Sequence, residues 1–116
     1  MDHKTKGKYG EAQAADFLIG QGFEILESNY RYGRGEIDLI ALLQNVLLVF
    51  VEVKIRKNEV FGQPESFVTD AQQERIMQVA EHYMEAIHWQ GDIRFDVIAI
   101  NESSGELLHI RDGFGY

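Results

Sequence analysis

The sequence predicts an α/β fold in which a mixed β-sheet is flanked by helices. The segments 36–42 and 47–54 are apolar over most of their length, and the second is apolar on both faces, as is typical of a central strand. Segments with apolar residues at helical spacing precede and follow these strands. Helices packed against a sheet bury both faces of such a strand, so the whole chain, 1–116, is expected to form a single domain.

The N-terminal half is expected to contain one helix and three strands. The helix runs from about residue 5 to Gly20, and Gly20 and Gly22 supply stop signals. A short strand over 23–28 follows, and the glycines and arginines of 29–35 indicate a loop. The two apolar strands then form a hairpin centred near Asn45.

The C-terminal half is expected to add a second helix and a second hairpin. After a loop over 57–66, the helix runs from Thr69 to about residue 88, and Gln72 stands at the spacing of a capping box. Its buried stripe is expected to comprise Ile76, Val79, Ala80, Tyr83 and Ile87. The two strands of the hairpin are expected over 93–100 and 107–111.

The composition excludes several classes of site. The chain has no cysteine, which excludes disulfides, thiolate zinc sites and cysteine nucleophiles, so any metal must be held by oxygen or imidazole. No apolar run approaches the roughly 20 residues of a membrane span. We therefore expect a cytoplasmic protein with no membrane partner.

The net charge of -8 disfavours simple binding to duplex nucleic acid, because such affinity comes largely from lysine and arginine. Positive charge can nevertheless be local. Arg31, Arg34 and Arg56 are the residues expected to contact phosphate groups.

Three charged residues stand in strands that otherwise look buried: Asp38, Glu52 and Lys54. Burying a charge costs several kcal/mol, of order 1–10, unless a partner or a metal compensates it, so these groups should lie together. In a hairpin centred on Asn45, Asp38 is opposite Glu52, and facing Cβ atoms are roughly 4.5 to 5.5 Å apart. Two carboxylates at that separation can hold one divalent cation, and Lys54 can orient a water molecule or stabilise a phosphate.

Glu11 and Glu36 extend this group of charges. Glu11 continues the inward stripe of the first helix, so it can complete a metal site from that side. Glu36 is opposite Lys54 in the same register, and we expect it to support the site by pairing with Lys54 or Arg34 rather than to bind the metal.

Asp38, followed after thirteen residues by Glu52-Val53-Lys54, resembles the PD-(D/E)xK motif of nucleases. The wider pattern resembles the YraN family of small bacterial endonucleases over nearly the whole chain. The matching segments are Gly10-Glu11, Gly22-Phe23, Asn29-Tyr30-Arg31, 35–41, 49–56, Phe61-Gly62 and 94–97. Ile37 stands where the motif has proline.

The resemblance implies a restriction-endonuclease-like fold, related to Holliday-junction resolvases, and hydrolysis of DNA phosphodiester bonds, including those of branched or structured DNA. It implies Mg²⁺ or Mn²⁺ as cofactor, and a homodimer by analogy. The ligands would be Glu11, Asp38, Glu52 and the backbone carbonyl of Val53. Relatives tend to have a lysine near the start of the second helix, where this chain has Gln72, which we expect to support the site and cap the helix.

Two other interpretations remain open. The chain can be a nuclease-fold module with little activity that binds nucleic acid or a protein partner, which the acidity and Gln72 favour. Alternatively, it can be a structural protein that uses its acidic surface for interaction, and then it should not bind nucleic acid even at low salt.

Overall fold

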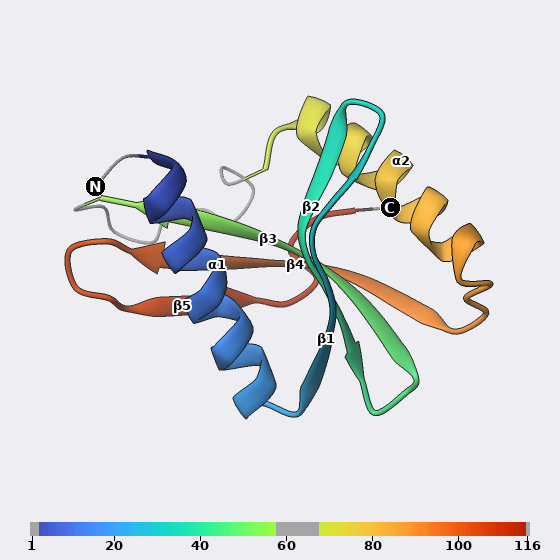
Figure 1. Ribbon diagram of the computed structural model, residues 1–116, viewed down its shortest axis with the longest axis horizontal. Helices are drawn as coiled ribbons and strands as arrows, with labels where there is room; N and C mark the ends of the chain where they lie inside the picture. Colours follow the sequence, from blue (N-terminus) through green and yellow to red (C-terminus); the bar gives the residue numbers. More distant parts are fainter. Residues whose placement is uncertain (1–2, 58–67, 116) are drawn as a thin grey trace.

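A computed structural model describes residues 3–57 and 68–115. Its elements, in chain order, are α1 (His3–Gly20), β1 (Phe23–Tyr32), β2 (Gly35–Leu43), β3 (Leu47–Arg56), α2 (Asp70–Ala86), β4 (Asp92–Asn101) and β5 (Leu107–Ile110). This is the predicted order of helices and strands (Figure 1). Apart from Lys57, the loop expected over 57–66 lies outside the described residues.

The strands of the described residues form one mixed sheet in the order β1-β2-β3-β4-β5. Every neighbouring pair is antiparallel except β3 and β4, which are parallel and are connected in the chain through α2. The central position of β3 explains why it is apolar on both faces. The α/β fold with a mixed sheet is therefore confirmed, and it is consistent with a restriction-endonuclease-like architecture.

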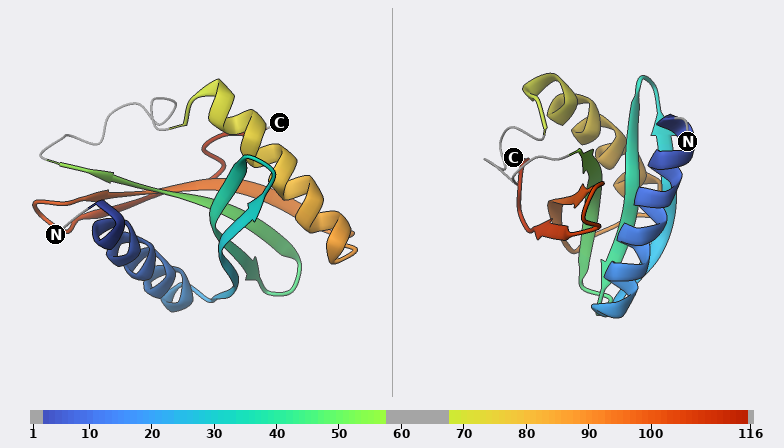
Figure 2. Two further views of the ribbon diagram at one scale, coloured as in Figure 1. Left: turned by 45° about the horizontal axis from the view of Figure 1, so that its top comes forward. Right: turned by 90° about the vertical axis from the view of Figure 1, so that its left-hand side faces the viewer.

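The two helices pack on opposite faces of the sheet (Figure 2). Leu18 of α1 packs with Val51 and Ile98 in one core, whereas Val79 of α2 packs with Phe50 and Phe95 in the other. Alternate residues of β3 thus enter different cores, as the two-residue period of a strand requires. Burial of these side chains is the main force that holds the helices on the sheet.

The β1–β2 connection differs from the loop predicted over 29–35. Strand β1 continues to Tyr32, and a tight turn containing Gly33, whose φ is +60°, leads directly to Gly35. Tyr30 contacts the Tyr83 ring edge to face, with centroids 4.9 Å apart. Pairing with β2 and this contact with α2 outweigh the loop-like local composition.

The helices agree with the prediction except at their ends. Thr69 and Gln72 form both hydrogen bonds of the capping box that precedes α2. Ile87 is not part of the buried stripe, because α2 ends at Ala86 and Ile87 is 41% exposed. Neither helix of the described residues is long and apolar enough to cross a membrane.

Candidate metal centre

The candidate site lies in a fork where β2 and β3 separate. These strands pair from Leu43 with Leu47 to Leu39 with Val51, so the hairpin is centred on Asn45 as predicted. Asp38 precedes Leu39 in β2 and is the first residue that is not paired with β3. Beyond this point, β2 continues beside β1 and β3 beside β4, so the two strands diverge (Figure 1).

At the base of the fork, the Asp38 side chain replaces the backbone hydrogen bonds that no longer join β2 to β3. Its Oδ2 accepts a hydrogen bond of 2.7 Å from the Val53 backbone N–H. Burial raises the pKa of Asp38 to about 6, although the Val53 hydrogen bond opposes the shift, and the Glu11 and Glu36 carboxylates raise it further. The hydrogen bond thus holds the side chain in place. The raised pKa shows that the surroundings do not compensate the negative charge of the ionised carboxylate fully.

Glu52 is the more deeply buried carboxylate of the fork, with only 6% of its surface exposed. Its Oε1 has no hydrogen-bond partner. Lys54 Nζ lies 3.9 Å from Oε2, the outer limit of an ion pair. Burial, and then the negative charge of Asp38, raise the pKa of Glu52 to about 8. A cation or a proton bound to this carboxylate would therefore stabilise it.

Glu11 of α1 reaches the same place, beside Glu36 and Asp38. Carboxylate oxygens of Glu11, Glu36 and Asp38 all lie within 4.8 Å of one another. Asn29 Nδ2 donates to Glu11 Oε1 at 3.0 Å and to Glu36 Oε1 at 2.9 Å, and Arg31 Nε donates to Glu36 Oε2 at 3.1 Å. Asn29, which presents this amide, has a positive φ of +54°, so its backbone departs from ordinary strand geometry.

A cavity of about 290 Å³ opens beside the fork. Five side chains of the predicted site line it: Arg34, Glu36, Asp38, Glu52 and Gln72. Gln72, Arg75 and Ile76 of α2 form its other side together with Gly35. Arg75 was missed by the sequence analysis. The signal that could have identified it is its position one turn after Gln72, on the same face of the helix.

The donor set fits a hard divalent cation. All four acidic side chains offer oxygen, which is the ligand that Mg²⁺, Mn²⁺ and Ca²⁺ prefer. The buried, unpartnered Oε1 of Glu52 is a group whose burial costs free energy unless a cation compensates it. The carboxylate oxygens of Glu11, Glu36 and Asp38 can therefore hold a metal ion between them, whereas Glu52, which the sequence predicted as a ligand, is not part of this group within the described residues.

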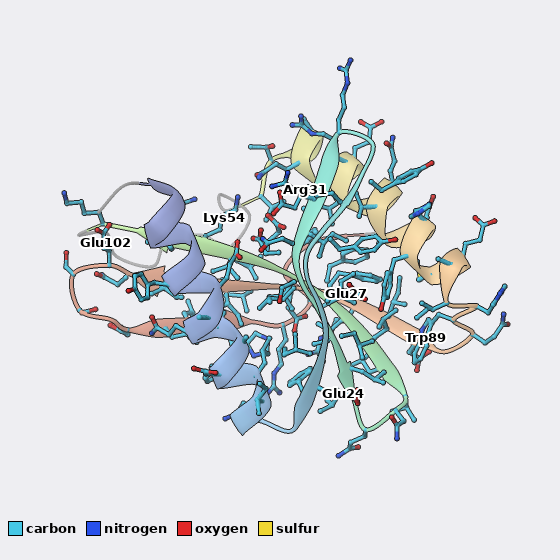
Figure 3. The ribbon with its side chains drawn as sticks, in the orientation of Figure 1. Glu24, Glu27, Arg31, Lys54, Trp89 and Glu102 are labelled. Carbon is cyan, nitrogen blue, oxygen red and sulfur yellow. The ribbon has the colours of Figure 1, made fainter. Side chains whose placement is uncertain are left out.

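The other predicted site residues are distributed as follows. Arg31 is exposed and pairs with Glu36, so it is Arg31, rather than Lys54 or Arg34, that meets this carboxylate. Lys54 lies on β3, one arm of the fork, and Arg31 lies on β1, which pairs with the other arm, β2 (Figure 3). Arg56 lies at the end of β3, where its Nη1 donates to the Ile55 carbonyl. The contact of Val53 is made by its N–H, and the role of its carbonyl stays a prediction.

A second buried acid, Asp96 of β4, has a complete set of partners. Arg94 donates two hydrogen bonds of 2.8 Å, His109 Nε2 lies 2.8 Å away, and the Asp112 N–H donates at 3.0 Å. Burial would raise the pKa of Asp96, but the hydrogen bonds from His109, Arg94 and Asp112 hold it below its ordinary value. This satisfied group stabilises the fold, in contrast to Glu52.

Comparison with known proteins relates the chain to one family. The model of the uncharacterised protein family UPF0102 matches residues 10–100. A UPF0102 protein of Cytophaga hutchinsonii is 48% identical over 114 residues, which are 97% of each chain. UPF0102 proteins of Geotalea daltonii and Christiangramia forsetii are 46% and 39% identical, and cover 97% and 99% of this chain and 91% and 98% of their own. Among solved structures, Pyrococcus furiosus SfsA in complex with Ca²⁺ matches at 14% identity with a TM-score of 0.35, over 95% of this chain and 64% of that one, which is too low for any argument.

Proposed function

Because the chain belongs to the UPF0102 family, the YraN family, and gathers carboxylates and a lysine in one fork, we propose that it is a divalent-metal-dependent DNA endonuclease. The observation that carries the proposal is the buried Oε1 of Glu52, which has no partner and stands beside a second carboxylate of raised pKa. A structural acid of this fold, Asp96, is fully paired. A buried acid with one oxygen left without a partner, such as Glu52, is better explained by a ligand that supplies positive charge.

The residues of the fork divide the work between them. Asp38 and Glu52 would hold Mg²⁺ or Mn²⁺, with Glu11 approaching from α1 and the Val53 carbonyl as a further ligand. The bound ion supplies Lewis acidity and neutralises charge on the phosphate. Lys54 holds a positive charge beside Glu52, where it can orient the attacking water or stabilise the phosphate. The Val53 N–H fixes the Asp38 carboxylate, because it occupies one of its oxygens.

Glu36 is expected to support the metal site through its hydrogen bonds rather than to bind the metal. Its two carboxylate oxygens accept hydrogen bonds from Asn29 and Arg31, which limits its freedom to bind a metal and suits a supporting role. Asn29 also holds Glu11, so one amide orients two carboxylates of the cluster.

The test is a cleavage assay on linear, nicked, flapped and four-way DNA with Mg²⁺ or Mn²⁺. We expect cleavage that requires the metal and is lost in Asp38→Ala, Glu52→Ala and Lys54→Ala. Glu24→Ala is the matched control, because Glu24 is an exposed acid at the far end of β1 (Figure 3). Metal-dependent cleavage that survives all three substitutions would disprove the proposal. The four-way arm tests branched DNA, and sedimentation of the same sample tests a homodimer.

A catalytically weak binding module is the second candidate. The Gln72 side chain favours it, because its Oε1 accepts from the Thr69 N–H and the residue brings no positive charge to the cavity. This candidate predicts DNA or protein binding without cleavage, and no stabilisation of the fold by Mg²⁺ or Mn²⁺.

A further inference from the structure

The cavity beside the fork carries two arginines that have no partner in the described residues. Arg34 comes from the β1–β2 turn and Arg75 from α2, and both line the cavity together with Asp38 and Glu52. Within residues 3–57 and 68–115, neither guanidinium forms an ion pair or a hydrogen bond. Arg94, by contrast, is held by two hydrogen bonds to Asp96.

Gly35 is the residue that brings the two arginines to one cavity. A Cβ at this position would lie 2.8 Å from the Arg75 carbonyl oxygen and 2.5 Å from Val79 Cγ2. The absence of a side chain therefore allows the tip of the β1–β2 hairpin to approach the backbone of α2. The residue before the glycine is Arg34, so the close approach places this turn arginine against the same helix that carries Arg75.

The lining of the cavity suits phosphate better than a nucleic-acid base. Within residues 3–57 and 68–115, its lining contains no aromatic side chain on which a base could stack, and Ile76 is the one large apolar residue of that lining. Carboxylates repel a phosphate group, so an acidic cavity that accepts one needs fixed positive charge as well as a metal. Unpaired guanidinium groups supply that charge, because they bind phosphate oxygens in a bidentate manner and remain charged at all ordinary pH values.

From this geometry we infer that Arg34 and Arg75 form an anion subsite that holds a phosphate of the nucleic-acid backbone next to the carboxylate cluster. The inference rests on the proposed function and deepens it. The substrate is recognised by the phosphates of its backbone rather than by the order of its bases. Arg75 is thereby a binding residue of the site, although it stands outside the motif strands.

Binding of a short fluorescent DNA duplex in Mn²⁺, measured by anisotropy over a range of salt concentrations, tests the subsite. Arg34→Gln and Arg75→Gln should each weaken binding about tenfold and lower the slope of log K against log salt by about one. Arg75→Lys should restore part of the loss, because it keeps the charge but not the fork of donors. Arg111→Gln is the control, since Arg111 is exposed and outside the cavity, and it should bind as the wild type does.

Calorimetry with Mn²⁺ and the cleavage assay distinguish failure of the subsite from failure of the proposed function. Calorimetry should show that Arg75→Gln binds Mn²⁺ as the wild type does. If Mn²⁺ binding and cleavage occur while both arginine variants behave like Arg111→Gln, the subsite is wrong and the nuclease stands. If no cleavage occurs but DNA binding depends on both arginines, the nuclease falls and the subsite stands. If inorganic phosphate binds the subsite and the DNA duplex does not, the assignment of the subsite to a nucleic-acid backbone is wrong.

Discussion

At the scale of single residues, the Glu52 carboxylate is buried in a position that favours the uncharged form of the acid. Its Oε1 has no partner, and Lys54 is 3.9 Å from the other oxygen. In the metal-free protein the ionised side chain is therefore a source of instability. A residue kept at such a cost is more readily explained by binding a ligand than by holding the fold.

Glu52→Gln should stabilise the metal-free protein and weaken its function. At pH 9 the substitution removes a buried negative charge that Lys54, 3.9 Å from Oε2, compensates only in part, so the free energy of unfolding should rise by about 1–3 kcal/mol. Urea denaturation in the presence of a chelator measures this change, and Glu24→Gln, at an exposed position, should have no effect. In Mn²⁺ the wild type should gain stability that Glu52→Gln does not. A variant that is less stable than the wild type at pH 9 without metal would contradict the account.

The raised pKa values predict how stability and metal binding depend on pH. Folding raises the pKa of Asp38 from 3.8 to about 6 and that of Glu52 from 4.5 to about 8. The folded protein therefore binds more protons than the unfolded chain between these values, and the metal-free protein should lose stability as pH rises from about 4 to 8.

Metal binding requires the ionised forms, so the rise in melting temperature caused by Mn²⁺ should increase over the same range of pH. Thermal melts at pH 5, 6.5 and 8, with and without Mn²⁺, measure both trends. The same rise at all three values would be evidence against ligation by these two acids.

Asp96→Asn should destabilise the protein without weakening metal binding, the opposite of what is expected for Glu52→Gln. Asp96 is fully buried and its pKa is lowered by hydrogen bonds from His109 and Arg94, so its stabilising contribution is present above pH 4 or so and is lost as pH falls below that value. Removing its charge leaves Arg94 without its anion, which should cost about 3–5 kcal/mol at pH 7 by urea denaturation. Mn²⁺ binding at low temperature should be retained. An unchanged stability with lost metal binding would show that Asp96 belongs to the site.

At the scale of elements, the fork depends on the contact between the β1–β2 hairpin and α2. Gly35 makes this contact possible, and the capping box at Thr69 fixes where α2 begins. The hairpin and the helix N-terminus together form the wall of the cavity that faces the carboxylates.

Gly35→Ala should therefore disturb the site as well as the fold. The added Cβ would meet Val79 Cγ2 at 2.5 Å and the Arg75 carbonyl oxygen at 2.8 Å, and overpacking of this kind costs about 1–3 kcal/mol. Gly20→Ala is the matched control, because a Cβ at Gly20 has no atom within 4 Å, and its stability should change little. Chemical denaturation gives the stabilities, and DNA affinity should fall in Gly35→Ala alone. Equal stabilities of the two variants would refute the close approach.

The elements also show what sequence can predict. The hairpin register followed from the polar turn at Asn45 and from the need to keep Asp38 and Glu52 together, because a slip by one residue would have put the two carboxylates on opposite faces of the sheet. The separation of β2 from β3 on the N-terminal side of Leu39 could not be predicted, because it depends on the pairing of β1 with β2 beyond the bulge between Ile25 and Glu27. The same pairing explains why 29–35 is a strand and a tight turn rather than a loop.

At the scale of the whole molecule, two helices cover opposite faces of the sheet, and the site lies where β2 and β3 part between the two layers (Figure 2). Glu11 comes from one layer and Arg75 from the other, while the strands supply Asp38 and Glu52. The convergence of Glu11 with Asp38 could be anticipated from the inward stripe of α1. The approach of Arg75 could not, because it depends on how α2 crosses the hairpin.

The net charge of -8 takes on a more specific meaning in this arrangement. Part of the acidity is concentrated in the fork, where a divalent cation would offset it, and Arg34 and Arg75, which have no partner among the described residues, line the same cavity. The overall acidity should make DNA binding weak without metal and stronger with it.

The most direct test of the central claim is a calorimetric titration of the chain with Mn²⁺ at pH 8, wild type against Asp38→Asn. We expect saturable heat in the wild type and none in Asp38→Asn, because the variant loses the carboxylate at the base of the fork. No heat in the wild type, or the same heat in both proteins, would contradict that claim.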